Sequence, residues 1–113
     1  MSQEDIVIVG MARTPMGGLL GELANLSAPE LGAVAVKAAV KEAGVSGADT
    51  IFMGNVLSAG QGQAPARQAA LKAGLDKGTQ AVTLNKMCGS GLQAVAMARQ
   101  ALLSGESDTV IAG

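Results

Sequence analysis

Short runs of branched aliphatic residues alternate along this chain with longer alanine-rich segments. Four of the short runs are expected to be strands, at 6–9, 50–53, 81–85 and 109–112. The segments between them have helical composition and spacing, with helices expected to begin at Ser27, Pro65 and Ser90. Alternating strands and helices indicate βαβ units. We therefore predict one α/β domain over residues 1–113, of order βαβαβαβ, with a mostly parallel sheet covered by helices.

The first strand and the first helix carry the clearest local signals. Ile6–Val9 shows no polar alternation, which predicts a strand buried on both faces. Ser27 is a favourable N-cap, Pro29 lies in the first helical turn, and Glu30 stands where a capping box requires an acidic residue. Gly44 is the expected residue at the carboxyl end of this helix.

The inventory of reactive side chains is small, because the chain has one cysteine, Cys88, and no histidine. One cysteine excludes an internal disulfide, a CxxC redox pair and a cysteine-rich zinc site, and without histidine no metal site is expected. Ser–His–Asp and Cys–His catalytic units cannot be assembled from this chain alone. With Phe52 as the only aromatic residue and a net charge of −1, no nucleic-acid surface is expected.

The amino-terminal residues give an expectation about location. Residues 1–5 are acidic where a secretory signal would be basic, so we expect no signal peptide. No apolar stretch has the length of a membrane span, and no membrane partner is expected. A reducing, cytoplasmic setting is therefore predicted.

Cys88 is the residue best placed for chemistry. It follows the third expected strand and precedes the helix expected from Ser90, so its thiolate would lie at the positive end of a helix dipole. Gly89 and Gly91 would let a substrate carbonyl approach closely, and neighbouring backbone N–H groups could hold an oxyanion. The alternatives are a small buried side chain and a redox-sensing thiol that needs an external partner. Lys86 could stabilise the thiolate further or be simply solvated.

Three glycine-containing patterns do not fit the sites that they resemble superficially. Residues 10–13 break the GxGxxG spacing of a dinucleotide-binding loop. Residues 60–62 lack the strand-to-helix context of such a loop and are expected to form an ordinary loop. Residues 89–91 do not form a GxSxG elbow, so Ser90 is interpreted as a helix-start residue and not as a nucleophile.

The string from Asn85 to Val95, Asn-Lys-Met-Cys-Gly-Ser-Gly-Leu-Gln-Ala-Val, resembles the nucleophile motif of the thiolases. Three further segments resemble the same family in chain order: the first strand and loop at 9–17, and the helix starts at 27–32 and 60–70. The related ketoacyl synthases carry a different sequence around their cysteine. The resemblance extends to the bacterial type of acetyl-CoA C-acetyltransferase, and it covers the whole chain.

The resemblance implies a specific acyl-transfer chemistry. Cys88 would attack an acyl-CoA thioester and hold the acyl group, with its own backbone N–H contributing to an oxyanion hole. A second acetyl-CoA, deprotonated at its α-carbon, would attack that acyl group to give acetoacetyl-CoA, and the reverse reaction is thiolysis. Coenzyme A thioesters would be the substrates, with no further cofactor and no metal, and the family suggests a homotetramer.

The chain also departs from the thiolase pattern. Thiolases are longer, and these residues correspond to most of the first of their two similar α/β halves. The family's Gly-His-Pro histidine, Asn-Glu-Ala-Phe asparagine, second Cys-Gly-Gly cysteine and CoA-binding loop domain have no counterpart here. The resemblance therefore implies that the isolated 113 residues are inactive. The alternatives are a non-enzymatic α/β module and one chain of a two-chain thiolase that needs a partner half.

Overall fold

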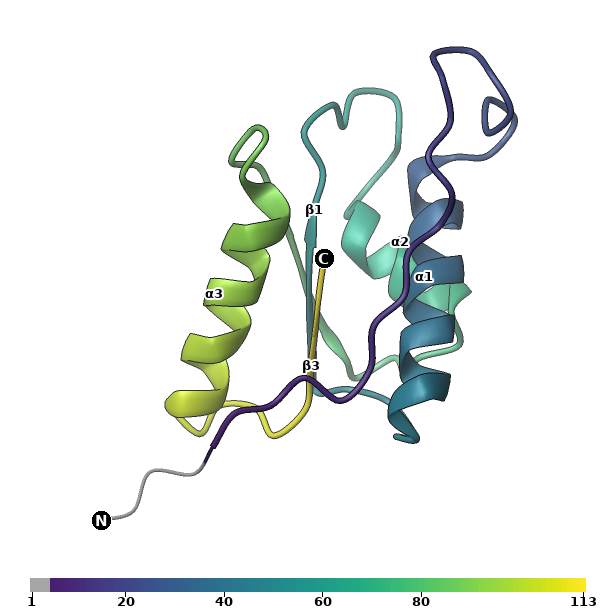
Figure 1. Ribbon diagram of the computed structural model, residues 1–113. Helices are drawn as coiled ribbons and strands as arrows, with labels where there is room; N and C mark the ends of the chain where they lie inside the picture. Colours follow the sequence, from purple (N-terminus) through teal and green to yellow (C-terminus); the bar gives the residue numbers. More distant parts are fainter. Residues whose placement is uncertain (1–4) are drawn as a thin grey trace.

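The computed structural model describes residues 5–113, which form a three-stranded parallel sheet and three α-helices (Figure 1). The expectation of no signal peptide depends on residues 1–5, and residues 1–4 lie outside the described residues. In chain order the elements are α1 (Ala28–Ala43), β1 (Thr50–Gly54), α2 (Pro65–Lys72), β2 (Gln80–Leu84), α3 (Ser90–Leu103) and β3 (Val110–Ala112). In the part of the chain with described coordinates, no helix is both long and apolar enough to cross a membrane. The α/β class and the positions of six of the seven expected elements are confirmed.

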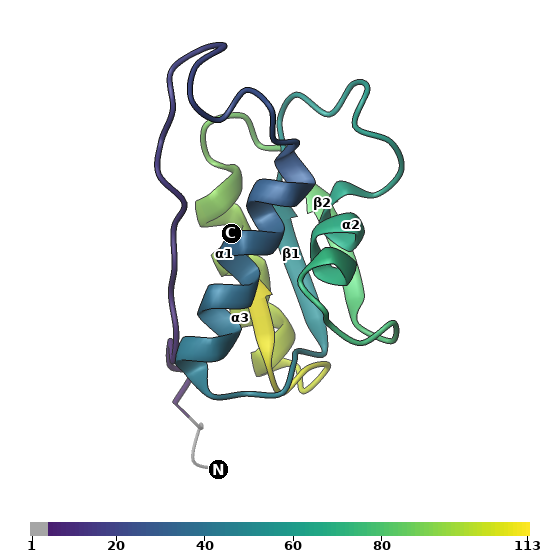
Figure 2. The same cartoon turned by 90° about the vertical axis from the view of Figure 1, so that its right-hand side faces the viewer.

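The sheet is organised around β1, its central strand. The strand order is β2-β1-β3, and β1 pairs in parallel with both neighbours. Side chains alternate across β1: Ile51 packs with buried residues of α1 and α2, whereas Phe52 packs with buried alanines of α3. Figures 1 and 2 show the resulting layers, with α1 and α2 on one face of the sheet and α3 on the other. The predicted strand at 50–53 is confirmed, and its Ile51 and Phe52 side chains are buried on opposite faces of the sheet.

The capping signals of α1 have the predicted geometry. The Ser27 hydroxyl accepts a hydrogen bond from the Glu30 N–H (3.3 Å), and the Glu30 carboxylate accepts one from the Ser27 N–H (2.7 Å). These bonds hold the pKa of Glu30 below its ordinary value. At the other end Gly44 adopts the left-handed conformation (φ 69°) of a C-terminal cap.

The prediction of a first strand at residues 6–9 is wrong. Ile6–Val9 forms no strand among the described residues, and Val7 and Ile8 are 66% and 81% exposed. The segment runs past the carboxyl end of α1, where the Met11 N–H donates to the Glu42 carboxylate (3.2 Å) (Figure 2). Branched aliphatic residues favour extended backbone, but a strand also needs a partner. The outer edges of β2 and β3 are open, but neither they nor any other described strand pairs with this segment.

Two close contacts determine how the layers and strands meet. A Cβ built on Gly54, at the end of β1, would lie 2.6 Å from the Ser90 Cβ atom, so the missing side chain lets α3 approach the sheet. At the opposite end of the sheet the Asp49 carboxylate accepts hydrogen bonds from the N–H groups of Asp108 (2.8 Å) and Thr109 (3.1 Å), just before β3. These bonds hold the pKa of Asp49 below its ordinary value.

Replacing Gly54 by alanine should destabilise the protein, because the added methyl group would force α3 away from β1. We expect Gly54→Ala to lower the free energy of unfolding by about 1–3 kcal/mol. The matched control is Gly47→Ala, since a Cβ at Gly47 meets no atom within 4 Å. Urea unfolding followed by circular dichroism measures both variants, and an equal effect of the two substitutions would contradict the packing described here.

The lowered pKa of Asp49 predicts a dependence of stability on pH. The carboxylate contributes stability that is fully present above its unfolded-state pKa, about 3.9, and is lost as the pH falls through the lower folded-state pKa. Asp49→Asn removes this titration but keeps an acceptor oxygen, so its unfolding free energy should fall less steeply in acid than that of the wild type. Glu22→Gln, in an exposed loop, is the charge-matched control. Parallel acid profiles for the wild type and Asp49→Asn would refute this role.

The 113-residue chain alone should associate in solution, because large apolar side chains such as Leu19 (95% exposed) and Leu57 (83%) lie uncovered. The outer edges of β2 and β3 also have no partner strand among residues 5–113. Light scattering coupled to gel filtration should show a mass that rises with concentration, together with binding of a hydrophobic dye. A monomer at every concentration that binds no dye would contradict this expectation.

Candidate active-site loop around Cys88

Cys88 lies in a short loop that joins the carboxyl end of β2 to the amino end of α3. This loop and the loop that follows β1 lie at the same end of the sheet (Figure 1). The side chain of Cys88 is exposed, so the interpretation of this residue as a buried hydrophobic side chain is wrong. The thiol at this position is accessible to solvent.

The loop is a tight turn with an unusual backbone conformation immediately before the cysteine. Met87 has φ 49°, in the left-handed region that non-glycine residues seldom occupy. The Gly89 N–H donates to the Lys86 carbonyl (2.9 Å), and the Ser90 N–H donates to the Met87 carbonyl (3.2 Å). Two of the N–H groups that were expected to be free near the thiol are thus used by the turn itself.

Other N–H groups at the start of α3 remain available. The first hydrogen bond of the regular helix runs from the Gln93 N–H to the Gly89 carbonyl (2.9 Å). Within residues 5–113, the N–H groups of Gly91 and Leu92 form no hydrogen bond. The amino end of α3 therefore keeps the donors and the positive dipole that favour negative charge nearby.

Ser90 begins α3, as predicted, but it also has a role that the sequence analysis missed. Its side chain is buried (6% exposed), and its hydroxyl accepts a hydrogen bond from the Lys86 N–H (2.9 Å). The same hydroxyl donates to the Met87 carbonyl (2.7 Å). Nothing in the residue pattern distinguishes this arrangement from an ordinary helix start, because it depends on the backbone of the turn.

Lys86 is less informative. Its ammonium group donates to the Gln93 side-chain oxygen (2.9 Å), and the contact is exposed. This partner lies in the first turns of α3, so Lys86 lies along the helix surface. The geometry favours the interpretation of Lys86 as a solvated side chain.

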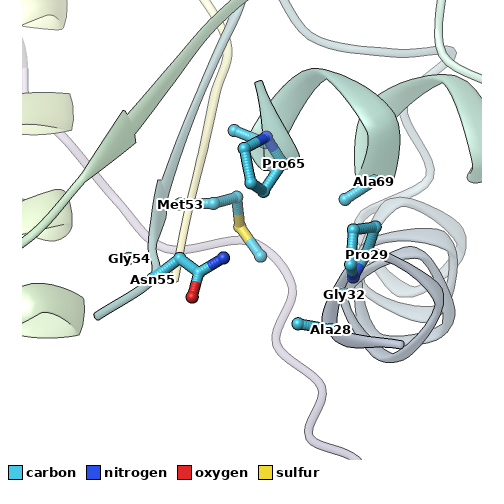
Figure 3. Close-up of a pocket in the computed structure, with 9 residues that line it drawn as sticks. Ala28, Pro29, Gly32, Met53, Gly54, Asn55, Pro65 and Ala69 are labelled. Carbon is cyan, nitrogen blue, oxygen red and sulfur yellow. The ribbon is translucent and has the colours of Figure 1, made fainter. Parts of the chain in front are cut away.

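A concave feature lies between the amino ends of α1 and α2 and the end of β1 (Figure 3). Its volume is about 80 Å³, and the Met53 side chain points into it. The lining residues are Ala28, Pro29, Gly32, Met53, Gly54, Asn55, Pro65, Ala66 and Ala69. The lining is mostly apolar and includes no residue of the Cys88 loop. Within residues 5–113, no group of three His, Cys, Asp or Glu side chains could hold a metal ion.

Comparison with protein families and known proteins gives a consistent result. The family model of the thiolase N-terminal domain matches residues 6–113. An acetyl-CoA acetyltransferase of Cupriavidus necator is 53% identical over 111 residues, which cover 96% of this chain and 28% of that protein. A probable acetyl-CoA acetyltransferase of Escherichia coli is 51% identical over 112 residues, covering 97% of this chain and 28% of that protein. The chain thus spans little more than a quarter of the length of these relatives.

Solved structures agree with the sequence comparison. The crystal structure of the Acat5 thiolase from Ascaris suum in complex with coenzyme A has a TM-score of 0.87 and 39% identity, over 90% of this chain and 27% of that chain. An acetyl-CoA acetyltransferase from Syntrophomonas wolfei has a TM-score of 0.85 and 39% identity, over 89% of this chain and 26% of that chain. The predicted thiolase-like α/β fold is confirmed. The chain belongs to the thiolase family, and residues 6–113 match its N-terminal domain.

Proposed function

We propose that this chain supplies the nucleophile of an acetyl-CoA acetyltransferase, and that the nucleophile is Cys88. The observation that carries the proposal is the exposed thiol on the loop between β2 and α3. Such a position offers an accessible sulfur, a helix dipole of the right sign and backbone donors close in sequence. The acetyl-CoA acetyltransferases among the relatives give the substrate class, which is a coenzyme A thioester.

The proposed first step is acyl transfer to sulfur. The Cys88 thiolate attacks the carbonyl carbon of acetyl-CoA, and a carbon–sulfur bond forms while the carbonyl oxygen becomes an oxyanion. The tetrahedral intermediate then expels the thiolate of coenzyme A, which takes up a proton. Backbone N–H groups stabilise the oxyanion in this scheme, and the N–H of Cys88 is the donor that the family resemblance suggests.

The proposed second step is a Claisen condensation. A second acetyl-CoA loses a proton from its α-carbon, and the resulting carbanion attacks the acetyl group on Cys88. The new carbon–carbon bond gives acetoacetyl-CoA, and the Cys88 thiolate leaves. Thiolysis is the same sequence in reverse. The scheme uses coenzyme A thioesters as substrates and needs no other cofactor and no metal.

The present residues account for only part of this scheme. A base must activate the thiol, and an acid or base must act on the α-carbon. The chain has no histidine and no second cysteine for these roles. We therefore propose that these groups come from thiolase sequence outside these 113 residues, in the same polypeptide or in a partner chain. A homotetrameric assembly and a cytoplasmic location complete the proposal.

The downstream reading frame distinguishes missing groups on the same polypeptide from missing groups on a partner chain. A continuous frame that encodes Gly-His-Pro and Cys-Gly-Gly motifs would identify one long polypeptide. A stop codon followed by a separate frame would identify a two-chain enzyme or a non-enzymatic module. In either arrangement the 113 residues alone should show negligible thiolysis.

Acetylation of Cys88 is the direct test of the proposed function. Complete protein, mixed with acetyl-CoA and quenched in acid, should gain the mass of one acetyl group, and peptide mapping should place that group on Cys88. Cys88→Ala should abolish the adduct and lower kcat for thiolysis by about 10⁴-fold or more, because the nucleophile is lost. The control is Ser104→Ala, at the far end of α3. This variant should keep the acetyl adduct on Cys88 and the wild-type kcat for thiolysis.

Two results would contradict the proposal. One is complete protein that carries no adduct at Cys88 under turnover conditions. The other is a Cys88→Ala protein that retains full thiolysis. An active, monomeric 113-residue chain would separately contradict the expectation that groups outside this chain are needed.

A further inference from the structure

The conformation of Met87 determines where the neighbouring thiol points. Within residues 5–113, the Cys88 thiol forms no hydrogen bond, so its direction depends on the backbone that carries it. That backbone turns at Met87, whose φ of 49° is unfavourable for a residue with a side chain. Something must therefore hold Met87 in this conformation.

Two side chains form hydrogen bonds to the backbone of Met87, one to its N–H group and one to its carbonyl. The Asn85 side-chain oxygen accepts a hydrogen bond from the Met87 N–H (3.0 Å). The Ser90 hydroxyl donates to the Met87 carbonyl (2.7 Å) and also accepts from the Lys86 N–H (2.9 Å). We refer to Asn85 and Ser90 together as the Met87 clamp. Both polar backbone groups of the left-handed residue are thus satisfied by side chains.

The clamp is itself anchored to the end of the sheet. Ser90 is buried, and its Cβ atom packs so closely on Gly54 of β1 that a methyl group there would lie 2.6 Å away. The Asn85 amide donates to the Val56 carbonyl (3.4 Å), in the loop that follows β1. Ser90 thus ties the turn to the end of β1, and Asn85 ties it to the loop that follows β1.

The other left-handed non-glycine residues of the described chain lack such a clamp. These residues are Leu20 and Ala64. The backbone carbonyl of Ala64 accepts from the Gln68 N–H (3.0 Å), as in any helix start, and no side chain within residues 5–113 bonds to the backbone of Leu20 or Ala64. The clamp is therefore a special feature of the residue before the cysteine.

We propose that Asn85 and Ser90 are positioning residues that hold Met87 in the left-handed conformation and thereby aim the Cys88 thiol at the thioester carbonyl. The inference rests on the proposed function of Cys88. Neither side chain needs to touch substrate. Their effect on the rate comes from alignment, to which acyl transfer is sensitive, since a displacement of about 1 Å can cost about a hundredfold in rate.

The first test compares Ser90→Ala and Asn85→Ala with the wild type in the complete protein. The measurement is the single-turnover rate of Cys88 acetylation by acetyl-CoA, followed by intact mass. Each variant should lose about tenfold or more in this rate, with the acetyl-CoA concentration for half-maximal rate changed by no more than about twofold. The matched control is Ser104→Ala, because the Ser104 hydroxyl also donates to the carbonyl three residues earlier (3.1 Å) and accepts a backbone N–H (3.4 Å). It should retain the wild-type rate.

The second test asks whether the clamp acts through Met87. Glycine enters the left-handed region without a side-chain penalty, so Met87→Gly should reduce the need for the clamp. In a double-mutant cycle, Asn85→Ala should therefore lower the acetylation rate by a smaller factor in the Met87→Gly protein than in the wild type. A purely structural role for Asn85 predicts the same factor in both proteins.

The outcomes separate this inference from the proposed function. Wild-type protein that is not acetylated on Cys88 would refute the proposed function itself. Acetylated wild type together with unaltered rates in Ser90→Ala and Asn85→Ala would refute only the positioning role, as would an equal loss in Ser104→Ala or an absence of coupling to Met87. If Ser90→Ala does not fold, the exposed Asn85 decides the question through Asn85→Ala and its cycle.

Discussion

The burial of β1 between two layers of helices is the constraint on which the rest of this structure depends. Ile51 and Phe52 point to opposite faces of the sheet and are both buried, one against α1 and α2 and the other against α3. Because β1 also pairs with β2 and β3, it fixes both the layers and the strand order. Parallel pairing with β2 then brings the carboxyl ends of these two strands to one end of the sheet, where ligands of open α/β sheets bind. The Cys88 loop starts there.

Much of the fold could be predicted from the sequence because its signals are local. The cap at Ser27 and Glu30 and the apolar run of β1 each correspond to interactions within a few residues or to simple burial. Ile6–Val9 shows the limit of this reasoning. Its residues favour an extended chain, but a strand forms only where it pairs with another strand, and which segments pair depends on the whole fold. The same limit explains why the sequence indicated Cys88 but not the Met87 clamp. A cysteine before a helix is visible as a pattern, whereas a left-handed turn held by Asn85 and Ser90 depends on the folded backbone.

The thiolase family membership and the geometry of the Cys88 loop both support the proposed acyl transfer to Cys88. The matched family domain contains the loop with an exposed thiol, a tight turn and a helix start. In this account the present residues provide the acyl acceptor and hold it at a defined angle. We propose that proton transfer and most of the contacts with coenzyme A come from thiolase sequence outside these 113 residues. The proposed division is consistent with a chain that has one cysteine and no histidine.

The central claim is that the loop between β2 and α3 presents Cys88 as the acyl acceptor, with its direction set by the left-handed Met87. A crystal structure of the complete protein, frozen shortly after exposure to acetyl-CoA, tests that claim most directly. We expect an acetyl group on the Sγ atom of Cys88, with Met87 still left-handed and still hydrogen-bonded to Asn85 and Ser90. An acetyl group on another residue, or an acetylated Cys88 on a loop in which Met87 has left that conformation, would contradict it.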